Sequence, residues 1–153
     1  EKVLTQAWSD EKQAFVESFG GQFLDASVLL MSEVGFIDPK DPRFVSTVEA
    51  LDKDLGRGSF MMRYQEADDF GEPETAFNIC AFWRLDALAK IGRMDEARAI
   101  FEDLLAARNS LGLMSEDTDF ETGAAWGNFP QTYSMVGIIN GAMRLSKPWD
   151  SVV

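Results

Sequence analysis

The stretch ETAFNICAFWRLDALAKI, Glu74–Ile91, is apolar over most of its helical surface. A helix with this pattern is buried on most sides, because every turn carries apolar side chains that can pack against neighbouring elements. Gly92 follows at the position where a glycine commonly ends a helix. The stretch therefore predicts a long central helix on which other elements pack.

Further helical patterns lie on both sides of this stretch. Residues 42–55 place their apolar side chains on one stripe, and Asp41 followed by Pro42 is typical of an N-cap and a first helical residue. Residues 94–109 also share one apolar face. Phe23–Val34 and Pro130–Leu145 are apolar almost throughout and predict two more buried helices.

The buried helices recur at a regular interval. They begin near Leu24, Phe77 and Pro130, at two equal steps of 53 residues, and an amphipathic helix with one exposed face follows each of the first two. This indicates an all-α fold of stacked helical hairpins, either a solenoid or a two-layer ring. The chain holds about two and a half hairpins, with no internal domain boundary. We therefore expect an uncovered apolar edge that meets the rest of a larger protein or another copy.

Composition excludes several classes of function. The net charge of −12 disfavours nucleic-acid binding, which depends on neutralised phosphates. The absence of histidine removes Ser–His and Cys–His catalysis. The single cysteine, Cys80, rules out an internal disulfide and is expected to be a small buried apolar residue. No apolar run approaches the ~18 residues of a membrane span. Cytoplasm is the favoured location, although a chain that starts at Glu1 gives no targeting signal to judge.

A long acidic segment stands between the last two predicted helices. Gly112–Gln131, GLMSEDTDFETGAAWGNFPQ, is here called the acidic loop. Most connections between packed elements have ~4–6 residues, and longer ordered ones are usually functional. Loops at 9–22, 57–73 and 111–129 all precede buried helices, so they should emerge at one end of the fold and converge on a pocket. We expect that pocket to hold Asp25, Arg63, Tyr64, Glu74, Phe77, Glu116, Asp117, Trp126 and Gln131.

Such a pocket combines carboxylates, a guanidinium and aromatic rings, as carbohydrate sites do. Two other interpretations stay open from the residues alone. The carboxylates can form a solvated loop face above core aromatics, or Asp117, Asp119 and Glu121 can bind calcium. For an EF-hand loop, however, Gly123 falls one place late and no bidentate glutamate follows at the right offset. No metal or other cofactor is expected.

Several motifs, in order, resemble the C-terminal part of glycoside hydrolase family 15, which contains glucoamylases, α-glucosidases and some trehalases. They are RFVSTVEAL, MMRYQEADDFGE, FNICAFWRLDALAKIGRMDEARAIFEDLL, LGLMSED with FETG, and GNFPQTYS. The resemblance extends from about Phe15 to Leu145. It implies an (α/α)6 toroid, of which residues 1–153 would form the C-terminal segment within a single catalytic domain.

The resemblance also implies roles for individual residues. The general base of the family falls on Glu116, within MSED, and the arginine that bonds substrate hydroxyls falls on Arg63. We expect the substrate-binding residues to be Arg63, Tyr64, Glu74, Phe77 and Gln131. Asp117, Asp119 and Glu121 are expected to shape and solvate the acidic loop.

The resemblance implies an inverting hydrolase of α-glucosidic bonds in oligosaccharides or disaccharides. Such enzymes pair a general base with a general acid. The family's general acid lies in a Trp-Glu motif, and none of the four tryptophans here precedes a glutamate. We therefore expect residues 1–153 to be a fragment that is inactive or nearly so when alone.

The rival interpretation is a non-enzymatic helical-repeat binding module, or an inactive scaffold with the same fold. GRMDEARAIFEDLLA reads like half of a tetratricopeptide repeat. Those repeats recur every ~34 residues with tight turns. The interval of 53 residues and the long acidic and aromatic loops favour the hydrolase.

Overall fold

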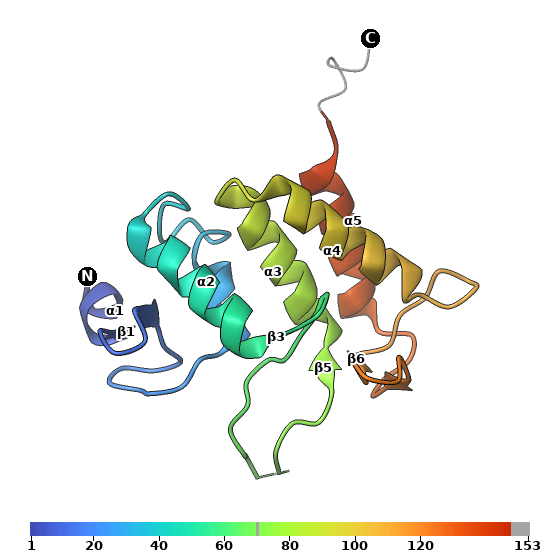
Figure 1. Ribbon diagram of the computed structural model, residues 1–153, viewed down its shortest axis with the longest axis horizontal. Helices are drawn as coiled ribbons and strands as arrows, with labels where there is room; N and C mark the ends of the chain where they lie inside the picture. The colour runs from blue at the N-terminus through green and yellow to red at the C-terminus, as the bar shows by residue number, and fades with distance from the viewer. Residues whose placement is uncertain (70, 148–153) are drawn as a thin grey trace.

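A computed structural model describes residues 1–69 and 71–147 of the chain. Within this part the fold is mostly helical, with helices that form one connected core (Figure 1). The helices are α1 (Lys2–Gln6), the 3₁₀ helix η1 (Ala26–Met31), α2 (Pro42–Leu55), α3 (Asn78–Lys90), α4 (Met94–Ala106) and α5 (Thr132–Leu145).

The expectation of a purely helical fold was wrong in one respect, because short strands join the loops. They are β1 (Trp8–Ser9), β2 (Ala14–Phe15), β3 (Gly56–Arg57), β4 (Phe60–Met61), β5 (Ala76–Phe77), β6 (Asp117–Thr118) and β7 (Ala125–Trp126). All of the pairings are antiparallel, in the sheets β1-β2, β3-β4 and β5-β6-β7. The third sheet joins the start of α3 to the acidic loop, which matters for the site.

Helix α3 is the centre of the molecule, as its apolar sequence predicts. Nine of its 13 residues are buried, and it packs against α2, α4, α5 and η1. Figure 1 shows α2 on one side of α3 and the pair α4 and α5 on the other. Cys80, on α3, is fully buried, which confirms its expected place in the core.

Helix α5 approaches α3 and α4 closely through two glycines. A Cβ atom on Gly137 would lie 2.4 Å from Cδ2 of Phe82 on α3. A Cβ on Gly141 would lie 2.9 Å from Cε2 of Phe101 on α4. The sequence of α5 is therefore matched to its neighbours by the absence of side chains at these two positions.

The amphipathic helix predicted over residues 42–55 is confirmed. The Asp41 carboxylate accepts a hydrogen bond from the Arg43 backbone N–H at 2.9 Å, as an N-cap does. Pro42 is the first helical residue. The predicted stripe is buried in the core: Phe44, Val48, Leu51 and Leu55.

Two predicted helices are shorter in the structure than their apolar patterns indicate. Phe23–Val34 forms only the 3₁₀ helix η1, and both end residues are exposed. Its start is fixed by Asp25, whose carboxylate accepts a hydrogen bond from the Ser27 N–H, and by a backbone bond from Ala26 to Arg63.

The helix predicted from Glu74 begins at Asn78 instead. Ala76 and Phe77 are extended because they pair with Thr118 and Asp117 across the third sheet. A partner about 40 residues away in the chain thus overrides the local helical pattern.

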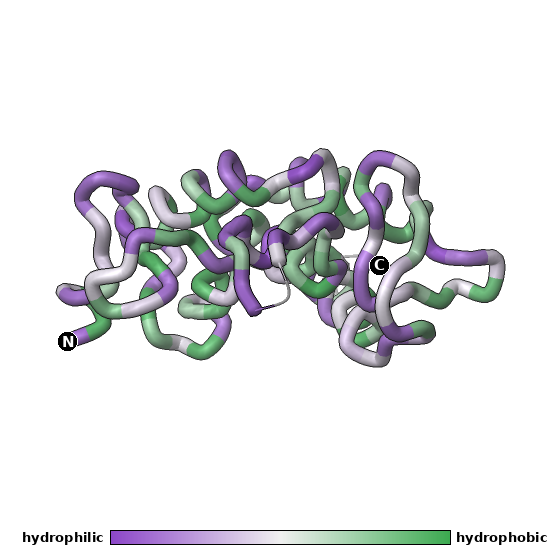
Figure 2. Tube along the Cα trace, turned by 90° about the horizontal axis from the view of Figure 1, so that it is seen from below, coloured by the Kyte–Doolittle hydropathy of each residue, from purple (hydrophilic) through white to green (hydrophobic). Residues whose placement is uncertain are grey.

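The uncovered apolar edge expected from the sequence lies on α5. Tyr133, Val136, Ile139 and Met143 recur at helical spacing and are between 41% and 73% exposed. The molecule is elongated (Figure 2), and α1 lies at the end opposite to α5. Whether six hairpins close into a ring stays a prediction. In the described part of the chain, no helix is long and apolar enough to cross a membrane.

Candidate active site

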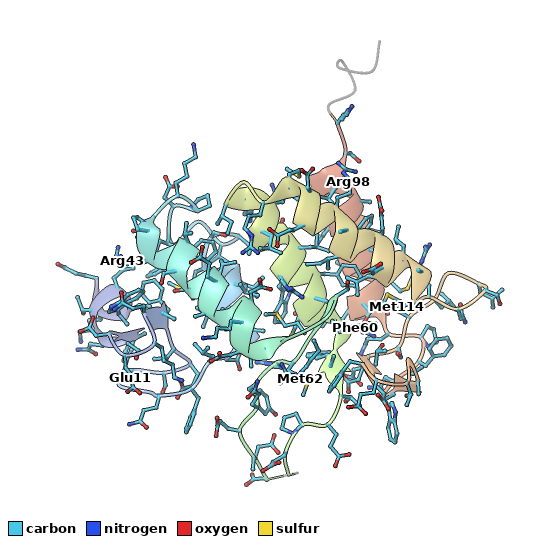
Figure 3. The ribbon with its side chains drawn as sticks, viewed as in Figure 1. Glu11, Arg43, Phe60, Met62, Arg98 and Met114 are labelled. Atoms are coloured by element: carbon cyan, nitrogen blue, oxygen red, sulfur yellow. The ribbon has the colours of Figure 1, made fainter. Side chains whose placement is uncertain are left out.

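Two loops at one end of α3 enclose the candidate site. The first comprises the described residues 62–69 and 71–75, and the second is the acidic loop. Met62, where the first loop begins, and Met114, near the start of the second, are each only 3% exposed (Figure 3). Between the loops lies a cavity of about 340 Å³, within the ~300–1,000 Å³ typical of small-molecule sites. It is here called the loop pocket, and it is lined by Arg63, Tyr64, Asp68, Gly71, Glu72, Pro73, Thr75, Phe77, Glu116 and Asp117.

Glu116 is held in the loop pocket by hydrogen bonds to both its backbone and its side chain. Its carbonyl accepts from the Asn78 N–H at 3.0 Å, and its N–H donates to the Asn128 carbonyl at 2.9 Å. Its carboxylate Oε2 accepts from the Asn128 N–H at 3.0 Å and from Nδ2 of the same residue at 2.8 Å. The carboxylate therefore has a fixed position on a loop.

A buried polar network anchors the residues beside Glu116. The Ser115 carbonyl accepts from Nδ2 of Asn78 at 3.0 Å and from Oγ of Ser134 at 2.8 Å. Oδ1 of Asn78 in turn accepts from the Thr118 hydroxyl at 2.9 Å. Asn78 and Ser134 are fully buried at the starts of α3 and α5. Because buried hydrogen bonds of this kind are costly to break, the acidic loop is tied firmly to both helices.

Gly127 lets the acidic loop close over Glu116. Its φ of +72° lies in the left-handed region that favours glycine. A Cβ atom there would stand 2.8 Å from Oε2 of Glu116 and 3.0 Å from its Cβ. Any side chain at this position would push the carboxylate aside.

The first loop and β5 supply the rest of the predicted pocket residues. The Arg63 Nε lies 3.4 Å from an Asp25 carboxylate oxygen, and the Arg63 side chain is 43% exposed, so its guanidinium can reach a ligand. The Tyr64 hydroxyl donates to Asp68 at 2.6 Å, and this hydrogen bond raises the pKa of Tyr64. Phe77, half-buried on β5, also lines the pocket.

Asp117 has a different electrostatic setting from the other carboxylates of the acidic loop. Burial, and then the negative charge of Glu116, raise the pKa of Asp117 to about 6, against a weaker opposing effect of Thr75. Asp119 accepts hydrogen bonds from the Glu121 and Thr122 N–H groups. The pKa of Asp119 is lowered, chiefly by Thr122. Asp119 thus shapes the loop as expected, whereas Asp117 belongs to the pocket wall.

The structure brings Arg63, Tyr64, Phe77 and Glu116 to one pocket and places the other two predicted site residues elsewhere. Glu74 lines a neighbouring cavity of about 480 Å³, beyond the ridge of Glu72 and Pro73 that both cavities share. Gln131 is the N-cap of α5, where its side chain accepts from the Tyr133 N–H at 3.4 Å.

Two further residues expected near the pocket also lie outside its lining. Trp126, on β7, is 57% exposed, and Asp25 is the N-cap of η1. The loop at residues 9–22, which was expected to converge with the others, contributes no lining residue. Two of the three predicted loops therefore form the pocket.

Sequence reasoning missed the residues that hold Glu116. Asn128 was identified only as part of a motif, and Asn78 and Ser134 look like ordinary positions within apolar helices. A buried asparagine between apolar residues is a usable signal, because a buried amide needs partners. The calcium interpretation finds no support: in residues 1–69 and 71–147 no group of three acidic or cysteine side chains could hold a metal ion.

The structure places carboxylates, a guanidinium and aromatic rings around an open pocket on a mostly helical frame, a combination that is typical of carbohydrate sites. Comparison with known proteins makes the assignment specific. The model of the family Glycosyl hydrolases family 15 matches residues 1–143, so the chain belongs to this family of glycoside hydrolases.

Individual relatives agree with the family assignment. A Thermoplasma acidophilum protein named Trehalase is 35% identical over 146 residues, which are 95% of this chain and 25% of that protein. A Mycobacterium tuberculosis protein of the same name is 34% identical over 139 residues, 89% of this chain and 20% of that protein. The chain thus spans a fifth to a quarter of the length of these relatives.

A solved structure named Glycosidase Wild Type has the same fold. It matches with a TM-score of 0.79 over 94% of this chain and 41% of its own, at 21% identity. The tetratricopeptide-like alternative is not favoured by these findings.

Proposed function

We propose that residues 1–153 supply the general base and part of the sugar-binding pocket of an inverting glycoside hydrolase that cleaves α-glucosidic bonds. In this proposal they form the C-terminal segment of a single catalytic domain. The observation that carries it is the carboxylate of Glu116, fixed in an open pocket beside an arginine and an aromatic ring.

The bonds to Glu116 suit a general base. Both hydrogen bonds from Asn128 end on Oε2, and within the described residues none reaches Oε1. The other oxygen, Oε1, is therefore available to take a proton from water, as a general base does. In inverting hydrolases that water attacks the sugar from the face opposite to the leaving oxygen.

The neighbouring side chains would bind and orient the sugar. Arg63 has several donors for ring hydroxyls, and the Tyr64 hydroxyl can accept a further hydrogen bond while it donates to Asp68. The Phe77 ring offers an apolar surface to the C–H groups of a glucose unit. Glu74 would meet only a longer substrate in the neighbouring cavity, and Gln131 would act through the start of α5.

The second carboxyl of the inverting pair is expected from residues other than 1–153. The pair stands roughly 6.5–9.5 Å apart, with the acid next to the leaving oxygen. No Trp-Glu motif is present in the 153 residues. The exposed apolar face of α5 would then be covered by the remainder of the catalytic domain or by another copy of the chain.

The relatives named Trehalase make α,α-trehalose the favoured substrate, with maltose and short α-glucans next. Glu116→Gln, in the enzyme as its gene encodes it, should lower kcat by ~10²–10⁴-fold, the usual contribution of a general base. The free energy of unfolding should change by less than ~1 kcal/mol, since the amide oxygen can still accept from Asn128. Proton NMR of the first sugar anomer released reports inversion directly.

Glu121→Gln is the matched control, because Glu121 lies in the same loop and lines the neighbouring cavity, which a disaccharide in the loop pocket would not reach. It should leave kcat unchanged. An unaltered kcat in Glu116→Gln would remove Glu116 from the role of base. Rapid hydrolysis of trehalose or maltose by residues 1–153 alone would show that the acid is present after all.

A further inference from the structure

Two consecutive carboxyl groups, Glu116 and Asp117, line the same pocket. This is unusual, because successive side chains of an extended segment point to opposite faces. Glu116 precedes β6, and its carboxylate turns to Asn128. Asp117 lies within β6 and is paired with Phe77 on one side and Trp126 on the other. The sheet therefore fixes Asp117 on the pocket wall independently of the bonds that hold Glu116.

The two carboxyl groups have different surroundings. Glu116 accepts two hydrogen bonds from Asn128, both on Oε2. Asp117 is half-buried, and Thr75 is the only hydrogen-bonding group among the causes that act on its pKa. Burial raises the pKa of Asp117 to about 6, and the charge of Glu116 adds to the rise. Asp117 therefore keeps its proton to a higher pH than an exposed aspartic acid does.

Other charged groups of the pocket do not cancel the raised pKa of Asp117. Among the described residues that line the pocket, Arg63 is the only cation, and it is paired with Asp25 at 3.4 Å. The remaining titratable wall residues are Tyr64, Asp68 and Glu72, and the buried thiol of Cys80 lies on α3. Of these described wall groups, the Glu116 carboxylate is the one whose charge acts on the pKa of Asp117, and it raises that pKa.

We propose that Asp117, while it holds its proton, donates a hydrogen bond to an oxygen of the glucose unit bound in the loop pocket. This inference rests on the proposed function, since it requires a sugar in the pocket. An ionised Asp117 can only accept hydrogen bonds and places a second negative charge beside Glu116. Sugar affinity should therefore be greatest while Asp117 holds its proton and should fall as that proton is lost.

Three variants separate the donor from the charge. Asp117→Asn keeps a hydrogen-bond donor but cannot ionise. Asp117→Ala has no hydrogen-bonding group and no ionisable group, and Glu121→Gln removes one charge outside the loop pocket. The affinity for glucose is measured by calorimetry between pH 5 and pH 8 on the gene product. In the wild type and in Glu121→Gln, affinity should fall by up to ~10-fold per pH unit above about 6. Asp117→Asn should stay flat near the low-pH affinity of the wild type, and Asp117→Ala should bind ~10-fold or more weakly at every pH.

A carboxyl ¹³C titration of residues 1–153 provides a readout that needs no sugar. The Asp117 signal should titrate near pH 6, and Glu116→Gln should lower that midpoint while burial keeps it above the ordinary 3.8. A midpoint near 4, or an Asp117→Asn profile that bends like the wild type, overturns this inference alone. Absence of glucose binding by the wild type at every pH overturns the proposed function, and with it the role of Asp117 as a sugar donor.

Discussion

Replacement of Gly127 by alanine tests whether the acidic loop holds Glu116 in place. Two costs are expected, and the structure separates them. The first is the left-handed backbone, φ +72°, which costs a non-glycine residue ~1–2 kcal/mol. The second is a collision, because the new Cβ would lie 2.8 Å from Oε2 of Glu116, where ordinary contacts begin near 3.4 Å. The carboxylate must therefore move by roughly half an ångström.

Gly123→Ala is the matched control for this experiment. Gly123 lies in the same loop with almost the same φ, +74°, and its Cβ would meet nothing within 4 Å. Both variants should lose ~1–2 kcal/mol of unfolding free energy, measured by tryptophan fluorescence in urea. Only Gly127→Ala should shift the Asn128 amide resonance and lower kcat, by ~10-fold or more, since a 1 Å displacement can cost ~10²-fold. Equal kcat in the two variants would refute the idea that this glycine positions Glu116.

Two further predictions concern stability. Because the pKa of Asp117 is raised in the folded chain to about 6 from 3.8, the folded state binds more protons than the unfolded state between these values, and stability falls as pH rises through this window. Asp117→Asn should therefore be more stable than the wild type at pH 7.5, by ~1 kcal/mol after allowance for solvent screening, and equally stable at pH 3.5. Chemical denaturation at both pH values checks the sign of this difference. Gly137→Ala should lower the free energy of unfolding by ~1–3 kcal/mol, because its Cβ would lie 2.4 Å from the Phe82 ring. Asn140→Ala, on the exposed face of the same helix, is the control and should change that free energy by no more than ~0.5 kcal/mol. Equal unfolding midpoints of the two variants would show that α5 can shift without cost.

Most helix positions and two of the three pocket loops could be predicted from the sequence. Asp41 followed by Pro42 set the start of α2, and the all-round apolar pattern identified the core helix that became α3. These signals are local, because a helix is closed by hydrogen bonds between residues four apart and by the capping of its own ends. Glu116 was identified by its motif rather than by its surroundings.

The boundaries and the electrostatics of the site depended on partners far away in the chain. Ala76 and Phe77 became a strand, not a helix, because Asp117 and Thr118 offered them backbone hydrogen bonds. The first residue of η1 is likewise bonded to Arg63 on another segment.

Asp117 is the clearest example of a residue whose properties depend on distant parts of the chain. In the sequence it is one of four similar carboxylates of the acidic loop, and it was expected both near the pocket and in the shaping and solvation of that loop. Only the folded chain buries it beside Glu116 and so raises its pKa to about 6. The sequence determined which residues carry carboxyl groups and which segments are helical. The tertiary structure decided which of these carboxyls is fixed by hydrogen bonds and which has its pKa raised, because burial and charge proximity exist only after distant segments have packed together.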